Sequence, residues 1–172
     1  LNFKFDYIFH FAGQSSAEKS FENPLVDIKN NTLSTINLIK FSIKKKVKKI
    51  IFASSMSVYG DSKTGFFSEK NELKPKSCYG ISKKTSEEYL KLFKHKVPYV
   101  ILRLFNVYGP GQDLANLKQG MVSIYVSQAL KKKKIIIKGS INRFRDFVSI
   151  NYLYKICEKL IFNKKIYNTT IN

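Results

Sequence analysis

This sequence has little of what several protein classes require. Its 172 residues include only two cysteines, Cys78 and Cys157. Two cysteines do not provide a disulfide framework, so we expect a reducing, cytoplasmic location. No apolar run reaches the roughly 20 residues that a helix needs to span a bilayer, and no signal peptide is recognisable. We therefore expect no membrane partner.

Acidic residues are also scarce, with 12 Asp and Glu against 31 Lys and Arg, which gives a formal net charge of +19. Such an excess raises the question of nucleic-acid binding. The lysine clusters at 44–46, 48–49, 131–134 and 164–165 are scattered over expected helix ends and solvent faces, and no zinc-finger or aromatic RNA-binding motif accompanies them. We predict no nucleic-acid partner, and a non-catalytic basic nucleotide- or nucleic-acid-binding protein is the alternative from another class.

Histidine is rare as well, with His10 and His95 as the two examples. Their positions do not suggest a metal-ligand spacing, so we predict no metal site. His10 is expected to pack at the end of a strand, and His95 is expected to be exposed.

The hydrophobic content of 44% is ordinary for a globular protein, and the length suffices for one domain with a core. Short apolar runs alternate with longer helical patterns, which predicts an α/β fold with a parallel sheet and right-handed crossovers. The expected strands cover 6–12, 49–53, 99–105, 135–137 and 147–150. The expected helices cover the stretch after Asn23-Pro24 to about 46, and 77–94, 120–130 and 151–162, and residues 60–76 are expected to form a loop.

The segment 77–83 reads Ser-Cys-Tyr-Gly-Ile-Ser-Lys and places Tyr79 and Lys83 one helical turn apart on one face. A free tyrosine has a pKa near 10 and is a poor base at neutral pH. A nearby lysine cation favours the phenolate and lowers that pKa. Such a pair can take a proton from a sugar hydroxyl while a cofactor takes a hydride. The spacing by itself also fits an exposed helix face in a lysine-rich chain.

Three other segments accompany this pair, in a fixed order: 51–60 (Ile-Phe-Ala-Ser-Ser-Met-Ser-Val-Tyr-Gly), 103–111 (Arg-Leu-Phe-Asn-Val-Tyr-Gly-Pro-Gly) and 143–148 (Arg-Phe-Arg-Asp-Phe-Val). Together they closely resemble the extended short-chain dehydrogenase/reductase family, and within it the NAD-dependent nucleotide-sugar epimerases and dehydratases. The resemblance covers residues 6 to about 153. It implies a Rossmann-like doubly wound parallel sheet, incomplete at the N-terminus, in a partial NAD-binding domain over 1–110. The start of a small substrate-binding domain would occupy 111–172.

The resemblance also assigns the site. It implies catalytic roles for Ser55, Tyr79 and Lys83. The implied NAD site comprises Phe11, Ala12, Gly13, Asn30, Tyr79, Lys83 and Phe105. The implied nucleotide-sugar site comprises Ser55, Ser57, Asn106 and Arg145. The candidates follow the carboxyl ends of expected strands, where open parallel sheets bind ligands, and a guanidinium such as that of Arg145 suits a diphosphate. Asn31, next to Asn30, leaves the register of the asparagine open.

The family's 4,6-dehydratases carry an Asp-Glu pair just after the position of Ser55, whereas this chain has Met56-Ser57. The leading expectation is therefore epimerisation of a nucleotide-sugar at C4, as in a UDP-glucose 4-epimerase of carbohydrate metabolism. A nucleotide-sugar 4-reductase or dehydrogenase, or a 4,6-dehydratase of the same fold, is the alternative.

The chain begins with Leu1 rather than Met and enters a strand at once, so we expect it to be a fragment. The family's Gly-rich phosphate loop and its acidic ribose-binding residue would precede residue 1. We expect the fragment alone to bind NAD poorly and to be inactive. The resemblance implies a homodimer for the full-length protein.

Overall fold

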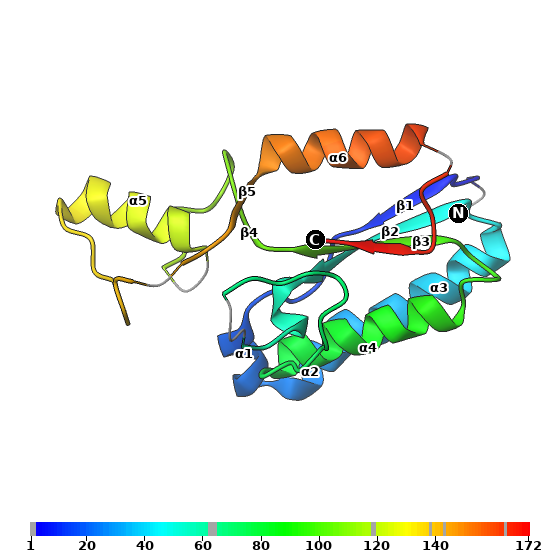
Figure 1. Ribbon diagram of the computed structural model, residues 1–172, viewed down its shortest axis with the longest axis horizontal. Coiled ribbons are helices and arrows are strands. Elements are labelled where there is room, and N and C mark those ends of the chain that lie inside the picture. The colour runs from blue at the N-terminus through cyan, green and yellow to red at the C-terminus, as the bar shows by residue number, and fades with distance from the viewer. Residues whose placement is uncertain (1–2, 62–64, 118–119, 138, 143, 164) are drawn as a thin grey trace. The chain divides into compact units, whose positions relative to one another are not determined.

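The computed structural model describes residues 3–61, 65–117, 120–137, 139–142, 144–163 and 165–172. It divides into two compact units (Figure 1). The first unit combines Leu1–Leu104 with Leu160–Asn172, and the second unit is Phe105–Lys159. The functional division of the chain at residue 110 stays a prediction.

The first unit is built on a four-stranded sheet in the order β1-β2-β3-β6, and every neighbouring pair is parallel. The strands are β1 (Tyr7–His10), β2 (Lys49–Ser55), β3 (Tyr99–Leu104) and β6 (Thr169–Ile171). The central strands β2 and β3 are nearly continuous apolar runs and are almost fully buried, as strands covered on both faces require. The predicted α/β class with a parallel sheet is thereby confirmed.

Helices that follow β1 and β2 pack together beside this sheet (Figure 1). A short helix α1 (Ala17–Glu22) precedes a run of α2 (Pro24–Ile28), the π-turn η1 (Lys29–Leu33) and α3 (Ser34–Lys45). The helix α4 (Cys78–Leu92) follows β2 and the 3₁₀ turn η2 (Met56–Val58). Residues of α3, α4, β2 and β3, with one residue of the connection before β3, form the core, which comprises Ile39, Ile50, Phe52, Leu90, Val97, Tyr99 and Ile101.

Local signals explain where these helices begin and end. The Asn23 side chain caps α2 by accepting from the Val26 amide, and Pro24 occupies the first helical position. Lys46 ends α3 in the left-handed conformation, with φ of 55°. Ser77 caps α4 through the Gly80 amide at 3.0 Å, which fixes the first turn that carries Tyr79.

The second unit contains the parallel pair β4 (Asn106–Tyr108) and β5 (Phe147–Ser149), with α5 (Met121–Lys132) between them in the chain. The helix α6 (Ile150–Phe162) begins in this unit. The strand predicted at 135–137 is wrong: these residues are irregular and each about half exposed. The amide of Ile136 donates to the Gln128 side chain at 2.8 Å instead of to a neighbouring strand.

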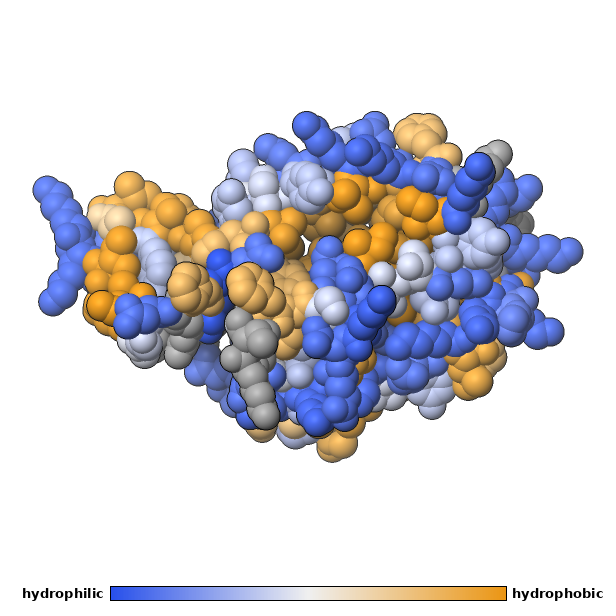
Figure 2. Space-filling model, viewed as in Figure 1, coloured by the Kyte–Doolittle hydropathy of each residue, from blue (hydrophilic) through white to orange (hydrophobic). Residues whose placement is uncertain are grey.

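The predictions for the two histidines are confirmed, because His10 is buried at the end of β1 and His95 is exposed. No helix among the described residues is long and apolar enough to cross a membrane. No group of three or more potential metal-ligating side chains occurs in the part of the chain that the structure covers. In each unit, hydrophilic side chains are spread over the visible face, with apolar residues exposed between them (Figure 2).

Candidate active site

The candidate site lies where β1 and β2 end, at the carboxyl edge of the sheet. Ser55 is the last residue of β2, and its hydroxyl accepts a hydrogen bond from the Ser57 amide at 3.2 Å. The two hydroxyls of Ser55 and Ser57 also lie 3.2 Å apart. The turn after β2 therefore presents both serines together.

The first turn of α4 packs directly against this turn. A side chain at Gly80 would place its Cβ 2.5 Å from the Ser57 carbonyl oxygen, so only glycine permits the approach. Tyr79 precedes Gly80 and retains 8% of its exposure, and Lys83 retains 4%. The structure thus brings together the three residues that were predicted to be catalytic: Ser55, Tyr79 and Lys83.

Lys83 is held by neutral partners rather than by a carboxylate. Its Nζ atom donates to the Ala53 carbonyl oxygen at 2.9 Å and lies 4.8 Å from the ring centre of Phe52. The same atom is 5.9 Å from the ring centre of Tyr79. Burial lowers the pKa of Lys83 to about 8, and the charge of Asp27 opposes this effect.

The net pKa of Tyr79 differs from the expectation. Burial raises it, hydrogen bonding with Ser55 lowers it, and the charge of Asp27 raises it further. Removal of the hydroxyl from water outweighs the hydrogen bond with Ser55, so the predicted depression of the pKa by Lys83 is not found. Tyr79 is therefore protonated at neutral pH in this structure.

A pocket of about 540 Å³ adjoins the end of β1. Its lining is mostly small or neutral polar: His10, Ala12, Gly13, Gln14, Lys29, Asn30, Leu33, Ser34 and Asn37. Three of the predicted NAD residues, Ala12, Gly13 and Asn30, are among them. Phe11 precedes them and packs edge-on against Phe9.

Gly13 and Asn31 make this pocket suitable for a flat, polar ligand. A Cβ atom at Gly13 would lie 2.4 Å from the Asn31 Oδ1 atom, so the loop after β1 needs a glycine here. Asn31 Oδ1 is buried and accepts no hydrogen bond from the described residues. Asn31 is thus buried behind the pocket, whereas Asn30 lines it, and the assignment of the cofactor-side asparagine to Asn30 stays a prediction.

The other predicted residues, Phe105, Asn106 and Arg145, belong to the second unit. Asn106 opens β4, and both its amide and its side chain donate to the Asp146 carbonyl, at 3.3 and 2.7 Å. Arg145 is exposed and donates to the Phe144 carbonyl at 2.8 Å. Asn106 and Asp146, the residue after Arg145, are therefore in contact within this unit. The roles of Phe105, Asn106 and Arg145 in ligand binding stay predictions.

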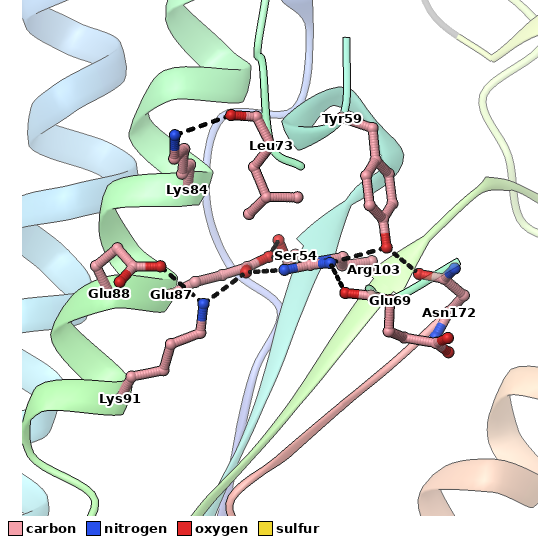
Figure 3. Close-up of polar contacts among 10 residues, drawn as sticks. All are labelled: Ser54, Tyr59, Glu69, Leu73, Lys84, Glu87, Glu88, Lys91, Arg103 and Asn172. Atoms are coloured by element: carbon pink, nitrogen blue, oxygen red, sulfur yellow. Dashed lines mark hydrogen bonds and ion pairs between the residues drawn. The ribbon is translucent and has the colours of Figure 1, made fainter. Parts of the chain in front are cut away.

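The sequence interpretation missed two buried polar clusters. One surrounds Asp27 on α2. The other centres on Arg103 of β3 and Glu87 of α4, whose side chains form two hydrogen bonds of 3.0 and 2.7 Å (Figure 3). Glu87 also accepts from Ser54, the neighbour of Ser55, at 2.5 Å. The spacing of Glu87, four residues after Lys83, was the available signal, because it places both side chains on one helix face.

His10 links the pocket to folding stability. Its Nε2 atom lies 2.9 Å from the Thr35 hydroxyl, and burial, with the charge of Lys83, lowers its pKa to about 4.

This lowered pKa predicts that the protein loses stability in acid. In the unfolded chain the imidazole has a pKa near 6.5, so below that pH the unfolded state takes up a proton that the folded state does not. The stabilisation is therefore fully present above pH 6.5 and is lost toward pH 4, by about 3 kcal/mol for a shift of this size. Urea unfolding of the full-length protein at pH 7 and 4.5 measures this loss. In His10→Gln the loss should largely disappear, with the exposed His95→Gln as control; equal losses in both variants would refute the assignment.

Comparison with known proteins shows which family this sequence matches. The pattern of the family described as NAD dependent epimerase/dehydratase matches residues 1–169. A Methanocaldococcus jannaschii protein, provisionally named a UDP-glucose 4-epimerase, is 39% identical over 159 residues, which are 90% of this chain and 52% of that protein. A GDP-6-deoxy-D-talose 4-dehydrogenase of Aggregatibacter actinomycetemcomitans is 33% identical over 97% of this chain and 55% of its own length.

Among solved structures, the UDP-glucose 4-epimerase of Thermotoga maritima with UDP-glucose is similar, with a TM-score of 0.87 and 34% identity. The match covers 97% of this chain and 54% of that structure. The chain thus spans about half the length of the relatives that it matches. The similarity confirms the Rossmann-like fold and the family resemblance that the motifs indicated.

Proposed function

This chain belongs to the NAD dependent epimerase/dehydratase family, and we propose that its full-length protein interconverts nucleotide-sugars that differ at C4. One observation carries the proposal: Ser55, Tyr79 and Lys83 are gathered at the carboxyl edge of the sheet. Helix α4 holds the last two, and Gly80 allows it to approach the turn of Ser55 and Ser57. UDP-sugars are the proposed substrates, as for the Thermotoga maritima relative, which was solved with UDP-glucose.

The pocket beside β1 fits NAD. The bare backbone at Gly13 admits a close ligand, and Asn31 offers a buried acceptor. Lys29 adds a cation at the rim. The proposed NAD contacts are Phe11, Ala12, Gly13, Asn30, Tyr79, Lys83 and Phe105. The chemistry that bound NAD would supply here is reversible hydride transfer with C4 of the sugar.

The residues of the chain supply the proton chemistry. Tyr79, once ionised, accepts the O4 proton as the C4–H bond breaks, which leaves a 4-keto sugar. Ser55 hydrogen-bonds the same oxygen and fixes its distance from Tyr79. Turning of the keto sugar exposes its other face, and Tyr79 returns the proton to O4 as hydride arrives at C4. No net oxidation occurs, so the products are the C4 epimer and the original enzyme.

Substrate binding is assigned to Ser55, Ser57, Asn106 and Arg145. Ser57 lies beside Ser55 and faces the same sugar. Arg145 is exposed, and its planar guanidinium suits the diphosphate. We further propose that the full-length protein is a homodimer. Within this chain Cys78 and Cys157 are both free thiols, and a reducing, cytoplasmic location is part of the proposal.

An epimerase is favoured over a dehydratase because Met56 and Ser57 open η2 where the loss of water would need carboxyl groups. A 4-reductase or dehydrogenase of the same fold is the second candidate, favoured by the similarity to the talose 4-dehydrogenase. The two differ in stoichiometry, because an epimerase leaves NAD unchanged whereas a dehydrogenase consumes it.

The test is an incubation of the full-length protein with UDP-galactose and NAD⁺, followed by chromatography for UDP-glucose. Formation of UDP-glucose without accumulation of NADH is the expected result. Accumulation of NADH in proportion to product would favour the dehydrogenase instead. Absence of any change in either nucleotide, with NAD bound, would reject UDP-galactose as a substrate. The 172-residue chain is expected to bind NAD weakly and to be inactive, and retention of NAD during dialysis would contradict that.

Gly13→Ala tests the NAD pocket. The added Cβ atom would meet Asn31 Oδ1 at 2.4 Å, so the loop must move out of the position in which it contacts NAD. We expect the Kd for NAD of the full-length protein to rise by about tenfold or more, equivalent to about 1.4 kcal/mol. Isothermal titration calorimetry measures the change. Gly65→Ala is the matched control, because it also puts a side chain on a glycine with positive φ, 78°, but nothing lies within 4 Å of the added Cβ atom; equal affinities for the two variants would contradict the assignment.

A further inference from the structure

A buried carboxylate that the proposed chemistry does not use lies on α2. Asp27 is 0% exposed. Its Oδ1 atom accepts from Gln14 Nε2 at 2.7 Å and from Asn31 Nδ2 at 3.1 Å. Its Oδ2 atom accepts from the Ser82 hydroxyl at 2.6 Å. Every one of these partners is a donor, which is the environment that an ionised carboxylate requires.

These partners belong to three segments of the site. Gln14 lies in the loop after β1 and lines the NAD pocket, where its side chain also bonds both the amide and the carbonyl of Ser16. Asn31 in η1 stands behind Gly13. Ser82 on α4 is adjacent to Lys83, and its hydroxyl lies 2.9 Å from the Tyr79 carbonyl oxygen. Asp27 is therefore the common partner of the pocket loop and the catalytic helix.

We propose, on the basis of the function proposed above, that Asp27 is a positioning residue that joins the cofactor pocket to the Tyr79–Lys83 helix, and that its buried negative charge sets the pH range in which this pair works. A buried charge without such a role would be an unnecessary cost, because an asparagine could make similar hydrogen bonds without one.

The direction of the electrostatic effect is the same for both members of the pair. Burial is the main influence on each pKa, and the negative charge of Asp27 raises the pKa of Tyr79 and that of Lys83. A carboxylate disfavours the phenolate and favours the ammonium. Asp27 thus helps to keep Lys83 charged in a buried position where a neutral amine is otherwise favoured.

The other titratable groups on the elements around Asp27 are exposed or are bonded to other partners. On α1 and η1 they are exposed: Glu18, Lys19, Glu22 and Lys29. On α4, Lys84 donates to the Leu73 carbonyl, Glu88 is exposed, and Glu87 is paired with Arg103. Asp27 is therefore the acidic group that acts on Tyr79 and Lys83 from α2.

Removal of this charge should move the activity profile along the pH axis. The proposed catalysis needs an ionised Tyr79 and a charged Lys83, so the two pKa values bound the active range. Loss of the Asp27 charge lowers both, and we expect both limbs of the kcat/KM profile to move by about 0.5 to 1 unit toward acid. A purely structural role would lower the height of the profile and leave its position unchanged.

Asp27→Asn removes the charge with little change of shape. Its Oδ1 atom still accepts from Gln14 and Asn31, and its new amide can donate to Ser82. The Ser82 hydroxyl can then direct its hydrogen to the Tyr79 carbonyl oxygen, which already lies within bonding distance. Ser82→Ala is the complementary variant, because it keeps the charge and removes one link between Asp27 and α4.

The decisive experiment is NMR titration of the Lys83 side chain in the full-length protein with ¹³C-labelled lysine and without substrate, the signal being assigned through Lys83→Met. We expect the Lys83 pKa in Asp27→Asn to lie about 0.5 to 1 unit below that of the wild type. Asp6→Asn, a half-exposed carboxylate paired with Lys48, should leave the titration unchanged. A folded Asp27→Asn protein with an unshifted Lys83 would overturn the proposal.

The kcat/KM profiles of the same proteins provide the second readout. Ser82→Ala should lose rate by about tenfold without displacement of the profile. If Asp27→Asn fails to fold, Ser82→Ala carries the test, and an unchanged rate there would overturn the positioning role. If the wild type does not interconvert nucleotide-sugars, the proposed function fails, and the titration of Lys83 still decides the electrostatic role of Asp27.

Discussion

Tyr79→Phe is expected to lower kcat for nucleotide-sugar epimerisation by about 10²- to 10⁴-fold, the range in which a positioned acid or base contributes. The change removes one oxygen atom and keeps the buried ring, so the fold and the packing of α4 should persist. The loss should appear in kcat rather than in KM, because the proton moves in the transition state and not on binding. Initial rates of UDP-glucose formation from UDP-galactose measure the effect.

Tyr89→Phe is the matched control for this experiment. Tyr89 lies on the same helix, is half-buried and packs against the core. Removal of its hydroxyl should change kcat by less than about twofold. A Tyr79→Phe enzyme that keeps more than about one tenth of the wild-type kcat would show that another group transfers the proton.

The second large effect is expected on stability, at the ion pair of Arg103 and Glu87. Their side chains are 3% and 0% exposed. The guanidinium of Arg103 donates two hydrogen bonds to the carboxylate of Glu87, of 3.0 and 2.7 Å. Arg103 also donates to the Tyr59 hydroxyl at 2.8 Å, which in turn donates to the side chain of Asn172, the residue after β6 (Figure 3). Burial opposes the charge of Arg103, but the hydrogen bonds to Glu87 and Tyr59 raise its pKa above the ordinary value.

Arg103→Met should lower the free energy of unfolding by about 3–5 kcal/mol, because it leaves the buried Glu87 carboxylate with the Lys91 ammonium at 3.7 Å in place of the directly bonded guanidinium. Urea unfolding of the full-length protein at pH 7 measures the loss. Arg103→Met combined with Glu87→Leu should recover much of it, since no uncompensated charge then remains. Lys48→Met is the control, because its pair with Asp6 is largely exposed and should contribute less than about 1 kcal/mol.

Two outcomes would contradict this account of the ion pair. A loss no larger than that of Lys48→Met would show that the buried pair contributes little. A double variant less stable than Arg103→Met would show that Glu87 has favourable contacts beyond its arginine, for which Ser54 at 2.5 Å and Lys91 at 3.7 Å are the candidates.

The sequence allowed the main sheet and the gathering of Ser55, Tyr79 and Lys83 to be predicted because both depend on short-range patterns. Apolar runs gave β1, β2 and β3, and the four-residue spacing put Tyr79 and Lys83 on one helix face. Short elements were harder. β6 has three residues, which form a strand only because they pair with β3 from far along the chain. β4 was not predicted as a separate strand, since its partner β5 lies some 40 residues away.

Electrostatic features could not be read from local sequence at all. The depth of Tyr79 in the fold decides that its pKa rises, and the sequence does not give that depth. Asp27 had no motif around it, and its importance depends on Gln14 and Ser82, which reach it from distant segments. The prediction of a strand at 135–137 was wrong for a related reason. A strand needs a neighbouring strand to bond its backbone, and here the Gln128 side chain of α5 accepts from the Ile136 amide instead.

The most direct test of the central claim follows the hydrogen at C4. The full-length protein is incubated with UDP-galactose that carries deuterium at C4, in ordinary water, and the UDP-glucose formed is examined by mass spectrometry and NMR. We predict that the deuterium stays at C4 of the product, because in the proposed reaction the hydrogen leaves C4 as hydride and returns to C4 as hydride, without exchange with solvent. Deuterium lost to the solvent would contradict hydride transfer at C4, and unchanged UDP-galactose would contradict the proposed substrate.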